Sequence, residues 1–330
     1  MNLNKNTSYV LIHILNGDDT AKKISEQMPS IDVRSIQRAL ARLTELGLLT
    51  RIGTNHPSYM INYFKLLNYN IPDKLLEDEN RPKSIFNHAL IDWLLKMSAD
   101  QFELILKSKL KDEAVLKHSK QMSAKELEYL TVELSWKSSA LEGNTYTLLD
   151  TQLLLLEGIK ARNRTAFETQ MILNHKDTIA FIIKNKELFG NNIKFRTIEE
   201  LHRIIGNNLG LTSGIRKQLI RITASNYEPL SSPHQLKENA DRVLEIINKV
   251  PNPYIKATLA LALIPYLQIF EDGNKRTGRM LANAILITLT NRGFSLRKTD
   301  ARKLALAYLA FYEFNSIYAL NRILEVELIN

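Results

Sequence analysis

The sequence predicts a mainly α-helical protein with a small N-terminal domain and a larger helical domain. Only 12 glycines and 9 prolines interrupt 330 residues, and apolar residues recur mostly at three- and four-residue spacing. The chain also exceeds the range of about 100 to 200 residues that is usual for one domain. We expect the first domain at residues 1–68, a helical connection at 69–119 and the second domain at 120–330.

The composition narrows the class of protein. With 45% hydrophobic and 24% charged residues, the chain matches ordinary folded proteins better than disordered or membrane proteins. It has no cysteine, which excludes disulfides, thiolate metal sites and thiol catalysis and fits a reducing compartment. Because no apolar stretch approaches the roughly 20 residues that span a bilayer, we expect a cytoplasmic protein without a membrane partner. The net charge of +9 favours polyanionic partners such as nucleic acid or nucleotides.

The first domain is expected to contain three helices followed by a hairpin. Apolar spacing and turn residues place the helices at 9–15, 21–27 and 33–46 and the strands at 48–52 and 59–63. Thr20 and Asp32 are suitable N-caps for the second and third helices, and Gly47 ends the third.

The third helix combines an apolar face with a basic one. The face that should pack inward carries Val33, Ile36, Leu40 and Leu43. The outward face carries Arg34, Gln37, Arg38, Ala41 and Arg42. With the hairpin that follows it, the stretch SIQRALARLTELGLLTRIG resembles the recognition helix and wing of winged-helix domains. The resemblance implies binding to duplex DNA through Arg34, Gln37, Arg38 and Arg42, and a protein-binding winged helix is the alternative.

The connection between the domains is marked by Pro72, Pro82 and the acidic run at 77–79. Beyond it, amphipathic helical segments are expected at 127–155 and 165–184. These segments begin the second domain.

Two further segments frame the part of the second domain that carries its chemistry. Residues 214–233 combine the β-prone QLIRIT with prolines and serines, so we expect a short β-hairpin or an extended flap. The run 253–267 is almost continuously apolar, which predicts a buried central helix.

The stretch QIFEDGNKRTGR, residues 268–279, joins this buried helix to the next one. Asp272, Gly273 and Asn274 predict a tight turn, after which a helix begins near Lys275. The first N–H groups of that helix would point to the loop and, with the helix dipole, attract an anion.

Charged side chains add to this anion site. Arg276 and Arg279 are three residues apart, so we expect them to share a helix face and to donate to phosphate oxygens. Asp272 offers the type of carboxylate that holds Mg²⁺ beside a polyphosphate. The alternative is a structural turn whose arginines pair with a carboxylate elsewhere.

The same loop is similar to the motif of the Fic family, His-x-Phe-x-Asp-Gly-Asn-(Gly or Lys)-Arg-x-x-Arg. It matches at Phe270, Asp272, Gly273, Asn274, Lys275, Arg276 and Arg279. The resemblance covers about residues 120–291 and implies an all-helical core that binds ATP with Mg²⁺ and transfers AMP to a hydroxyl of a target protein. It implies that Asp272 holds the metal, Gly273 and Asn274 form the anion hole, and the two arginines hold the phosphates. Lys275 also occurs in the Doc branch, which transfers phosphate, so the transferred group stays open.

One position departs from the motif. The family's general base is a histidine two residues before Phe270, and here that residue is Gln268. A primary amide cannot take up a proton near neutral pH, so transfer should be weak or absent while binding survives. Candidate substitutes for the base are His175, His202 and His234, of which His234 follows the expected flap most closely.

A second motif lies before the core. The sequence SSALEGN places Ser138 four residues before Glu142, which Gly143 follows. It resembles the inhibitory helix of the Fic family, in which a glutamate pairs with the second motif arginine and blocks placement of the γ-phosphate. Here that pair would be Glu142 with Arg279, and the alternative is an exposed helix end stopped by glycine.

These features support three hypotheses about function. The first is a nucleotide-responsive regulator that binds ATP, is inhibited from within its own chain and binds DNA through its winged helix. The second is an active enzyme that transfers AMP or phosphate to a target protein of unknown identity. The third is a Fic fold kept only as a dimerisation scaffold for the winged helix, which would make the protein a homodimer.

Overall fold

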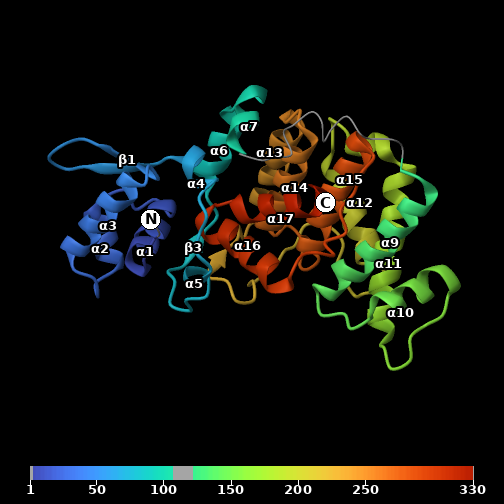
Figure 1. The fold of residues 1–330 in the computed structure, drawn as a ribbon. Coiled ribbons are helices and arrows are strands. Elements are labelled where there is room, and N and C mark those ends of the chain that lie inside the picture. The colour runs from blue at the N-terminus through green and yellow to red at the C-terminus, as the bar shows by residue number, and fades with distance from the viewer. Residues whose placement is uncertain (1–2, 107–121, 330) are drawn as a thin grey trace.

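The computed structural model describes residues 3–106 and 122–329, and it confirms the mainly helical fold class. A small N-terminal unit lies at one end and a larger helical body forms the rest (Figure 1). The domain boundary predicted at residues 119 and 120 lies outside the described residues. Within the described ranges, no helix is long and apolar enough to cross a membrane.

The N-terminal unit contains the predicted three helices and hairpin. Its elements are α1 (Lys5–Leu15), α2 (Ala21–Gln27), α3 (Val33–Glu45), β1 (Leu49–Ile52) and β2 (Ser58–Ile61). The two strands pair antiparallel, with Leu49 opposite Ile61. Thr20 and Asp32 cap α2 and α3 as expected, since their side chains accept from the backbone N–H groups of Lys23 and Ser35.

One residue of α3 was predicted wrongly. Val33 is 48% exposed, whereas Ala39 joins Ile36, Leu40 and Leu43 on the buried face. Val33 is the first residue of the helix and faces a groove beside α2 and the hairpin instead of the core. The inward face is therefore shorter than the apolar spacing suggested.

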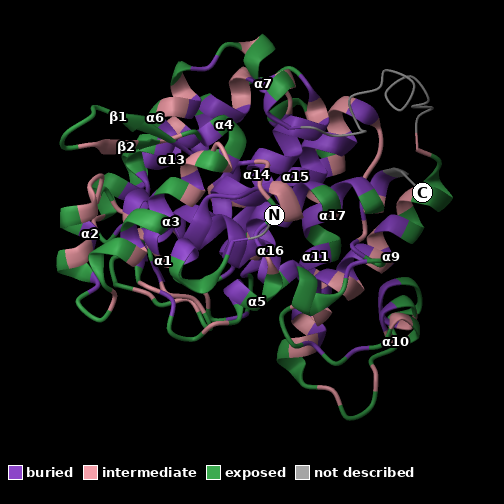
Figure 2. Cartoon of the chain, turned by 60° about the vertical axis from the view of Figure 1, so that its left-hand side comes forward, coloured by how far each residue is buried: buried purple, intermediate pink, exposed green. Residues whose placement is uncertain are grey.

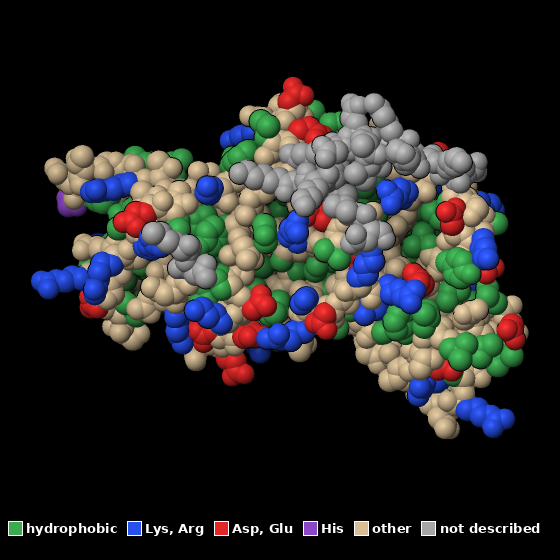
Figure 3. Space-filling view, viewed as in Figure 1, with side chains coloured by type: hydrophobic (Ala, Val, Ile, Leu, Met, Phe, Trp, Pro, Cys, Tyr) green, Lys and Arg blue, Asp and Glu red, His purple; other side chains and the backbone are tan. Residues whose placement is uncertain are grey.

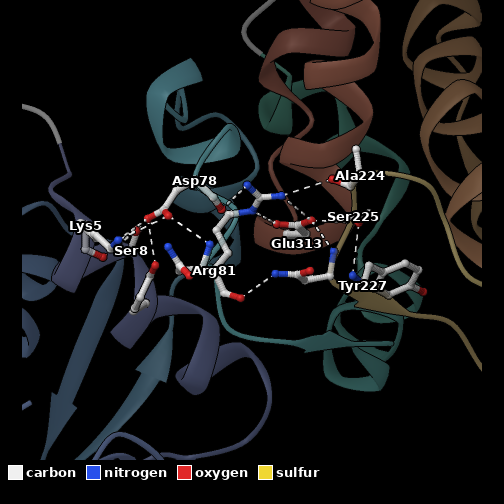
Figure 4. A network of polar contacts seen from close by, with 11 residues as sticks. Lys5, Ser8, Asp78, Arg81, Ala224, Ser225, Tyr227 and Glu313 are labelled. Carbon is white, nitrogen blue, oxygen red and sulfur yellow. Dashed lines mark hydrogen bonds and ion pairs between the residues drawn. The ribbon is translucent and has the colours of Figure 1, made fainter. Parts of the chain in front are cut away.

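A connecting segment joins this unit to the body. It contains α4 (Tyr63–Leu66), α5 (Asp73–Leu76), β3 (Ser84–Ile85), α6 (His88–Lys96) and α7 (Ala99–Ile105). Between α5 and β3, buried Arg81 forms an ion pair with buried Glu313, and its Nη1 donates to the carbonyl of Asp78 (Figure 4). The Asp78 carboxylate in turn accepts from Tyr9 of α1 at 2.8 Å. These contacts tie the N-terminal unit to the body.

The helical body is built around two central helices. Its elements are α9 (Ala124–Ala140), α10 (Leu148–Gln152), the π-helical turn η2 (Leu153–Glu157), α11 (Ala166–Lys184), the 3₁₀ turn η3 (Lys186–Phe189), α12 (Phe195–Ile205), β4 (Tyr227–Glu228), α13 (Pro233–Lys249), α14 (Pro253–Leu267), α15 (Asn274–Thr290), α16 (Ala301–Phe314) and α17 (Tyr318–Ile329). Every residue of α14 from Tyr254 to Leu267 is buried, as its apolar sequence predicted. Figure 2 shows the buried residues concentrated on α14 and α15. Gly278 lets these helices approach, because a Cβ there would lie 2.8 Å from the ring of Pro265.

For the segment 214–233 we predicted either a β-hairpin or an extended flap, and the structure shows the extended flap. It contains no hairpin, and its only strand, β4, pairs in parallel with β3 of the connecting segment. Arg216 explains this, because its buried guanidinium donates to the carbonyls of Gln218, Leu230 and Gln268. These bonds hold the segment, called the flap below, in an extended conformation against the loop that follows α14.

Candidate functional site

The loop between α14 and α15 has an unusual backbone at both ends. Gln268 caps α14 in the left-handed region with φ 49°, and Gly273 caps α15 with φ 80°. A side chain at Gly273 would be strained at that angle and would lie 3.4 Å from the ring of His202. The local sequence therefore fixes where α15 begins.

Side chains inside the loop hold its shape. The amide of Asn274 accepts from the backbone N–H of Phe270 at 3.0 Å and donates to its carbonyl at 2.8 Å. The Phe270 ring stacks on His202 with centroids 3.7 Å apart. His202 Nε2 lies 2.9 Å from the carbonyl oxygen of Asp272, to which it must donate. His202 is thus a support of the loop, a role that the sequence did not indicate.

The two motif arginines point to different partners, so the prediction of a shared phosphate face was incomplete. Arg276 Nη2 donates to the Asp272 carboxylate at 2.8 Å. Its Nε and Nη1 are buried and have no hydrogen-bond partner among the described residues. Arg279, 1% exposed, instead points to α9, where its Nε donates to Ser138 Oγ at 3.0 Å.

Glu142 lies beside Arg279, its predicted partner. Its carboxylate accepts from Arg279 Nη2 at 2.6 Å, and Arg279 Nη2 also lies 3.2 Å from the carbonyl of Ser138. Burial opposes ionisation, but the charge and hydrogen bond of Arg279, aided by Arg276 and Lys275, hold the pKa of Glu142 below its usual value. Glu142 is therefore an anion paired with the second motif arginine.

A cavity of about 230 Å³ lies between the loop and the flap. Its lining comprises flap residues 220–223 together with Glu142, Gln268, Glu271, Asp272, Gly273, Asn274, Lys275 and Arg276. This volume is below the range of about 300 to 1,000 Å³ that is usual for ligand sites, and Glu142 is one of the residues that border the cavity. The start of α15 lines the cavity together with Arg276, two of whose nitrogens are buried without a partner among the described residues. A helix N-terminus beside a guanidinium is an arrangement suited to an anion.

Gln268 borders this cavity, but its side chain carries no atom that is basic enough to take up a proton. Its Nε2 donates to the carbonyl of Pro265 at 2.6 Å, and its Oε1 accepts from Asn274 at 3.2 Å. None of the three candidate histidines replaces it: His175 and His202 are bound elsewhere, and His234 is exposed on α13 outside the residues that line the cavity.

The residues at the cavity fit Mg²⁺ only together with a bound polyphosphate. The side chain of Asp272 is 65% exposed, and one of its oxygens accepts from the backbone N–H of Gly273 at 2.5 Å. Glu271 also borders the cavity. Over residues 3–106 and 122–329, no group of three or more possible ligand residues could hold a metal by itself. Mg²⁺ usually takes one or two carboxylates and completes its shell with phosphates and water, so Asp272 is a suitable ligand.

Arg216 is the site residue that sequence reasoning missed. It is buried, and burial lowers its pKa, yet its acceptors are backbone carbonyls of the loop and flap. The sequence around it carries no signal for this role, because the need for a donor arises only when two distant segments leave carbonyls facing each other.

Three of the four predicted DNA-binding residues border hollows of the N-terminal unit. Gln37 borders a groove of about 770 Å³ together with Lys22 of α2 and Arg51 of β1. Arg38 and Arg42 instead border a separate hollow of about 360 Å³ beside the start of α1. Arg34 is exposed. On the face in Figure 3, lysine and arginine side chains are interspersed with acidic ones and form no continuous basic stripe.

Comparison with known proteins relates part of the second domain to a protein family. Residues 192–286 match the sequence model of the Fic/DOC family. Protein adenylyltransferase Fic of Nematostella vectensis is 27% identical over 157 residues, which are 46% of this chain and 36% of that protein. Protein adenylyltransferase fic-1 of Caenorhabditis elegans is 25% identical over 154 residues, 45% of this chain and 30% of that protein. The match thus spans about a third of the length of these curated relatives.

The fold is also found in a solved structure. A Fic domain containing signaling protein from Bacteroides thetaiotaomicron superposes with a TM-score of 0.53 at 20% identity. The superposition covers 66% of this chain and 90% of that protein. At this identity the likeness shows the fold alone.

Proposed function

Because residues 192–286 form a Fic/DOC domain similar to protein adenylyltransferases, we propose that this chain binds ATP with Mg²⁺ at the cavity beside α15. One observation carries the proposal. Arg276 is buried, yet two of its guanidinium nitrogens have no partner among the described residues. Buried donors are rarely left unpaired, and phosphate oxygens in the adjoining cavity would satisfy both nitrogens.

The chain's own residues define what this site would do with the nucleotide. The start of α15, Lys275 and Arg276 would bind the phosphates, and Asp272 would hold Mg²⁺, which supplies neutralising charge when bound. Gln268 can orient a hydroxyl but cannot remove its proton. We therefore infer a nucleotide-responsive regulator in which transfer is weak or absent.

We further propose that Glu142 inhibits this site. By pairing with Arg279 it engages the second motif arginine and narrows the cavity that it borders. A carboxylate in that position also repels phosphate oxygens. ATP would bind with full affinity only when Glu142 releases Arg279.

Calorimetry on the full chain tests the nucleotide site. Arg276→Ala should weaken binding of ATP with Mg²⁺ about tenfold or more, because a charge-assisted hydrogen bond is lost. Arg203→Ala is the matched control, since Arg203 is an exposed arginine paired with Glu200 on α12. Equal affinities for the Arg276 and Arg203 variants would remove the proposed site.

The second candidate is an active enzyme that transfers AMP or phosphate to a protein hydroxyl. The basic residues Lys275 and Arg276 at the cavity and the exposed carboxylate of Asp272 favour it. Incubation with cell lysate and ATP labelled on the α- or the γ-phosphate separates the two functions. Label from either position on a protein would support the enzyme and identify the transferred group.

For the N-terminal unit we propose a winged helix that binds duplex DNA. Three helices, a hairpin and a groove bordered by Lys22, Gln37 and Arg51 support this proposal. Fluorescence anisotropy at low salt should show binding that weakens as salt rises, because bound cations are released from DNA. Arg51→Ala should weaken DNA binding more than Arg38→Ala, because Arg51 borders the groove. The reverse order would mean that the outward face of α3, where Arg38 lies, makes the main contact with DNA. Absence of binding at low salt would leave a protein-binding role.

A further inference from the structure

His175 is a buried histidine that neither the loop nor the cavity uses. It lies on α11 with no exposed surface, and its Nδ1 is 2.8 Å from the carbonyl oxygen of Met171. A carbonyl can only accept, so Nδ1 carries the hydrogen. Burial lowers the pKa of His175 to about 3, with the charges of Arg276 and Arg279 acting in the same direction. The ring is therefore neutral, and its Nε2 is an acceptor.

This tautomer fixes the direction of the next hydrogen bonds. Nε2 lies 2.9 Å from Ser138 Oγ, so the serine hydroxyl must donate to it. With its hydrogen committed there, Ser138 Oγ presents lone pairs to Arg279 Nε, which donates at 3.0 Å. The bonds thus run in a single direction, from Arg279 through Ser138 and His175 to Met171.

The same serine stands one helical turn before the inhibitory glutamate. Ser138 lies in the last turn of α9, and Glu142 follows directly after the helix ends. Arg279 contacts both residues, through Nε at Ser138 and through Nη2 at Glu142. A change in the direction of the Ser138 hydroxyl would therefore act on the guanidinium that Glu142 holds.

We propose that His175 is a positioning residue of the Glu142–Arg279 pair, which it supports by accepting the Ser138 hydroxyl and directing Ser138 Oγ toward Arg279. This inference rests on the proposed inhibition by Glu142. Any buried imidazole nitrogen needs a partner, but the partner of His175 Nε2 is the same Ser138 hydroxyl that accepts from Arg279. The bond to α9 is what links His175 to the inhibitory pair.

Binding of ATP with Mg²⁺ to four full-chain variants tests the proposal. His175→Leu removes the acceptor at similar side-chain volume, so affinity should rise about two- to tenfold, the effect of one hydrogen bond. His175→Gln retains an acceptor and a donor and should bind as the unaltered protein does. In a Glu142→Gly background, His175→Leu should have no further effect, because the pair it supports is gone.

Three outcomes would overturn the proposal. These are an unchanged or lower affinity in His175→Leu, the same gain in the Glu142→Gly background, or a gain in His175→Gln equal to that in His175→Leu. The first two would mean that His175 acts as an ordinary core residue.

Nitrogen-15 NMR of the unaltered protein keeps the test independent of folding in the variants. His175 should give the signals of a neutral ring protonated at Nδ1, assigned by their loss in His175→Gln. A ring protonated at Nε2 would overturn the proposal even if His175→Leu fails to fold. If no variant binds ATP, including Glu142→Gly, the proposed nucleotide function fails, and the NMR result still decides the direction of the bonds.

Discussion

The role of Gln268 can be tested by restoring the motif histidine while removing the inhibitory glutamate. Gln268 adopts φ 49°, in the left-handed region where histidine is several-fold enriched over most side chains. Its Nε2 already donates to the carbonyl of Pro265 at 2.6 Å. A histidine whose Nδ1–H donates to the same carbonyl would keep Nε2 free as a base. The backbone therefore tolerates Gln268→His.

The size of the effect follows from what each change supplies. A positioned general base contributes about 100- to 10,000-fold in rate, which is roughly 3 to 5 kcal/mol of activation free energy. Arg279, however, is buried and held by Glu142 at 2.6 Å. Two unit charges about 4 Å apart near a protein surface attract by about 4 kcal/mol before desolvation, so ATP competes poorly for this arginine. We expect each single change to give little transfer and Gln268→His with Glu142→Gly to give at least about 100-fold more.

The assay measures label from α-labelled ATP on the protein itself or on lysate proteins. Gln268→Asn with Glu142→Gly is the matched control, because asparagine also accepts a left-handed backbone and lacks a basic nitrogen. Equal transfer by the histidine and asparagine double variants, with equal ATP binding, would refute the claim that the missing base limits this site. Transfer by the unaltered protein at the rate of the histidine double variant would show that Gln268 is no impairment.

Three further predictions concern stability. Arg81→Ala removes the charged partner of buried Glu313 and should lower the free energy of unfolding, measured by urea denaturation, by about 3 to 5 kcal/mol. Arg302→Ala, which breaks an exposed ion pair, is the control and should lower it by less than about 1 kcal/mol. Arg216→Met removes the donor for three carbonyls, so limited proteolysis should cut residues 214–230 faster than in the exposed-site control Lys217→Met; equal cleavage would contradict this. The pKa of His175, about 3, lies below its ordinary value of 6.5, so the unfolded chain takes up a proton that the folded chain refuses. Stability should therefore fall as pH drops from about 6.5 toward 3, by at most about 1.4 kcal/mol per pH unit, and His175→Gln should show a shallower fall in pH-dependent thermal unfolding.

Much of the fold follows from local sequence. The helix at 253–267 was predicted at its observed bounds, because an apolar run between Asn252 and a polar loop leaves no other length for a buried helix. The helix at 21–27 was equally clear from its N-cap, Thr20. Predictions failed where tertiary contacts decided the outcome. Val33 matched the apolar spacing but lies beyond the core, and the β-prone stretch QLIRIT at 218–223 forms no strand.

The sequence by itself determined the residues of the site. The order of Asp272, Gly273 and Asn274 specifies a turn and a helix start, and these local features place a helix N-terminus at the loop without reference to the rest of the chain. The separate stretch SSALEGN pointed to Glu142 as the partner of Arg279, through its resemblance to a known motif.

Only the tertiary structure decided which groups act on one another. Arg276 borders the cavity and has two buried nitrogens without a partner among the described residues, whereas Arg279, three residues later, contacts Ser138, 141 residues away in the chain. His175 and Arg216 enter the site through contacts between helices or with backbone carbonyls. The physical reason is that a buried donor or acceptor must find a partner. Where that partner lies depends on how distant segments pack, which local spacing does not encode.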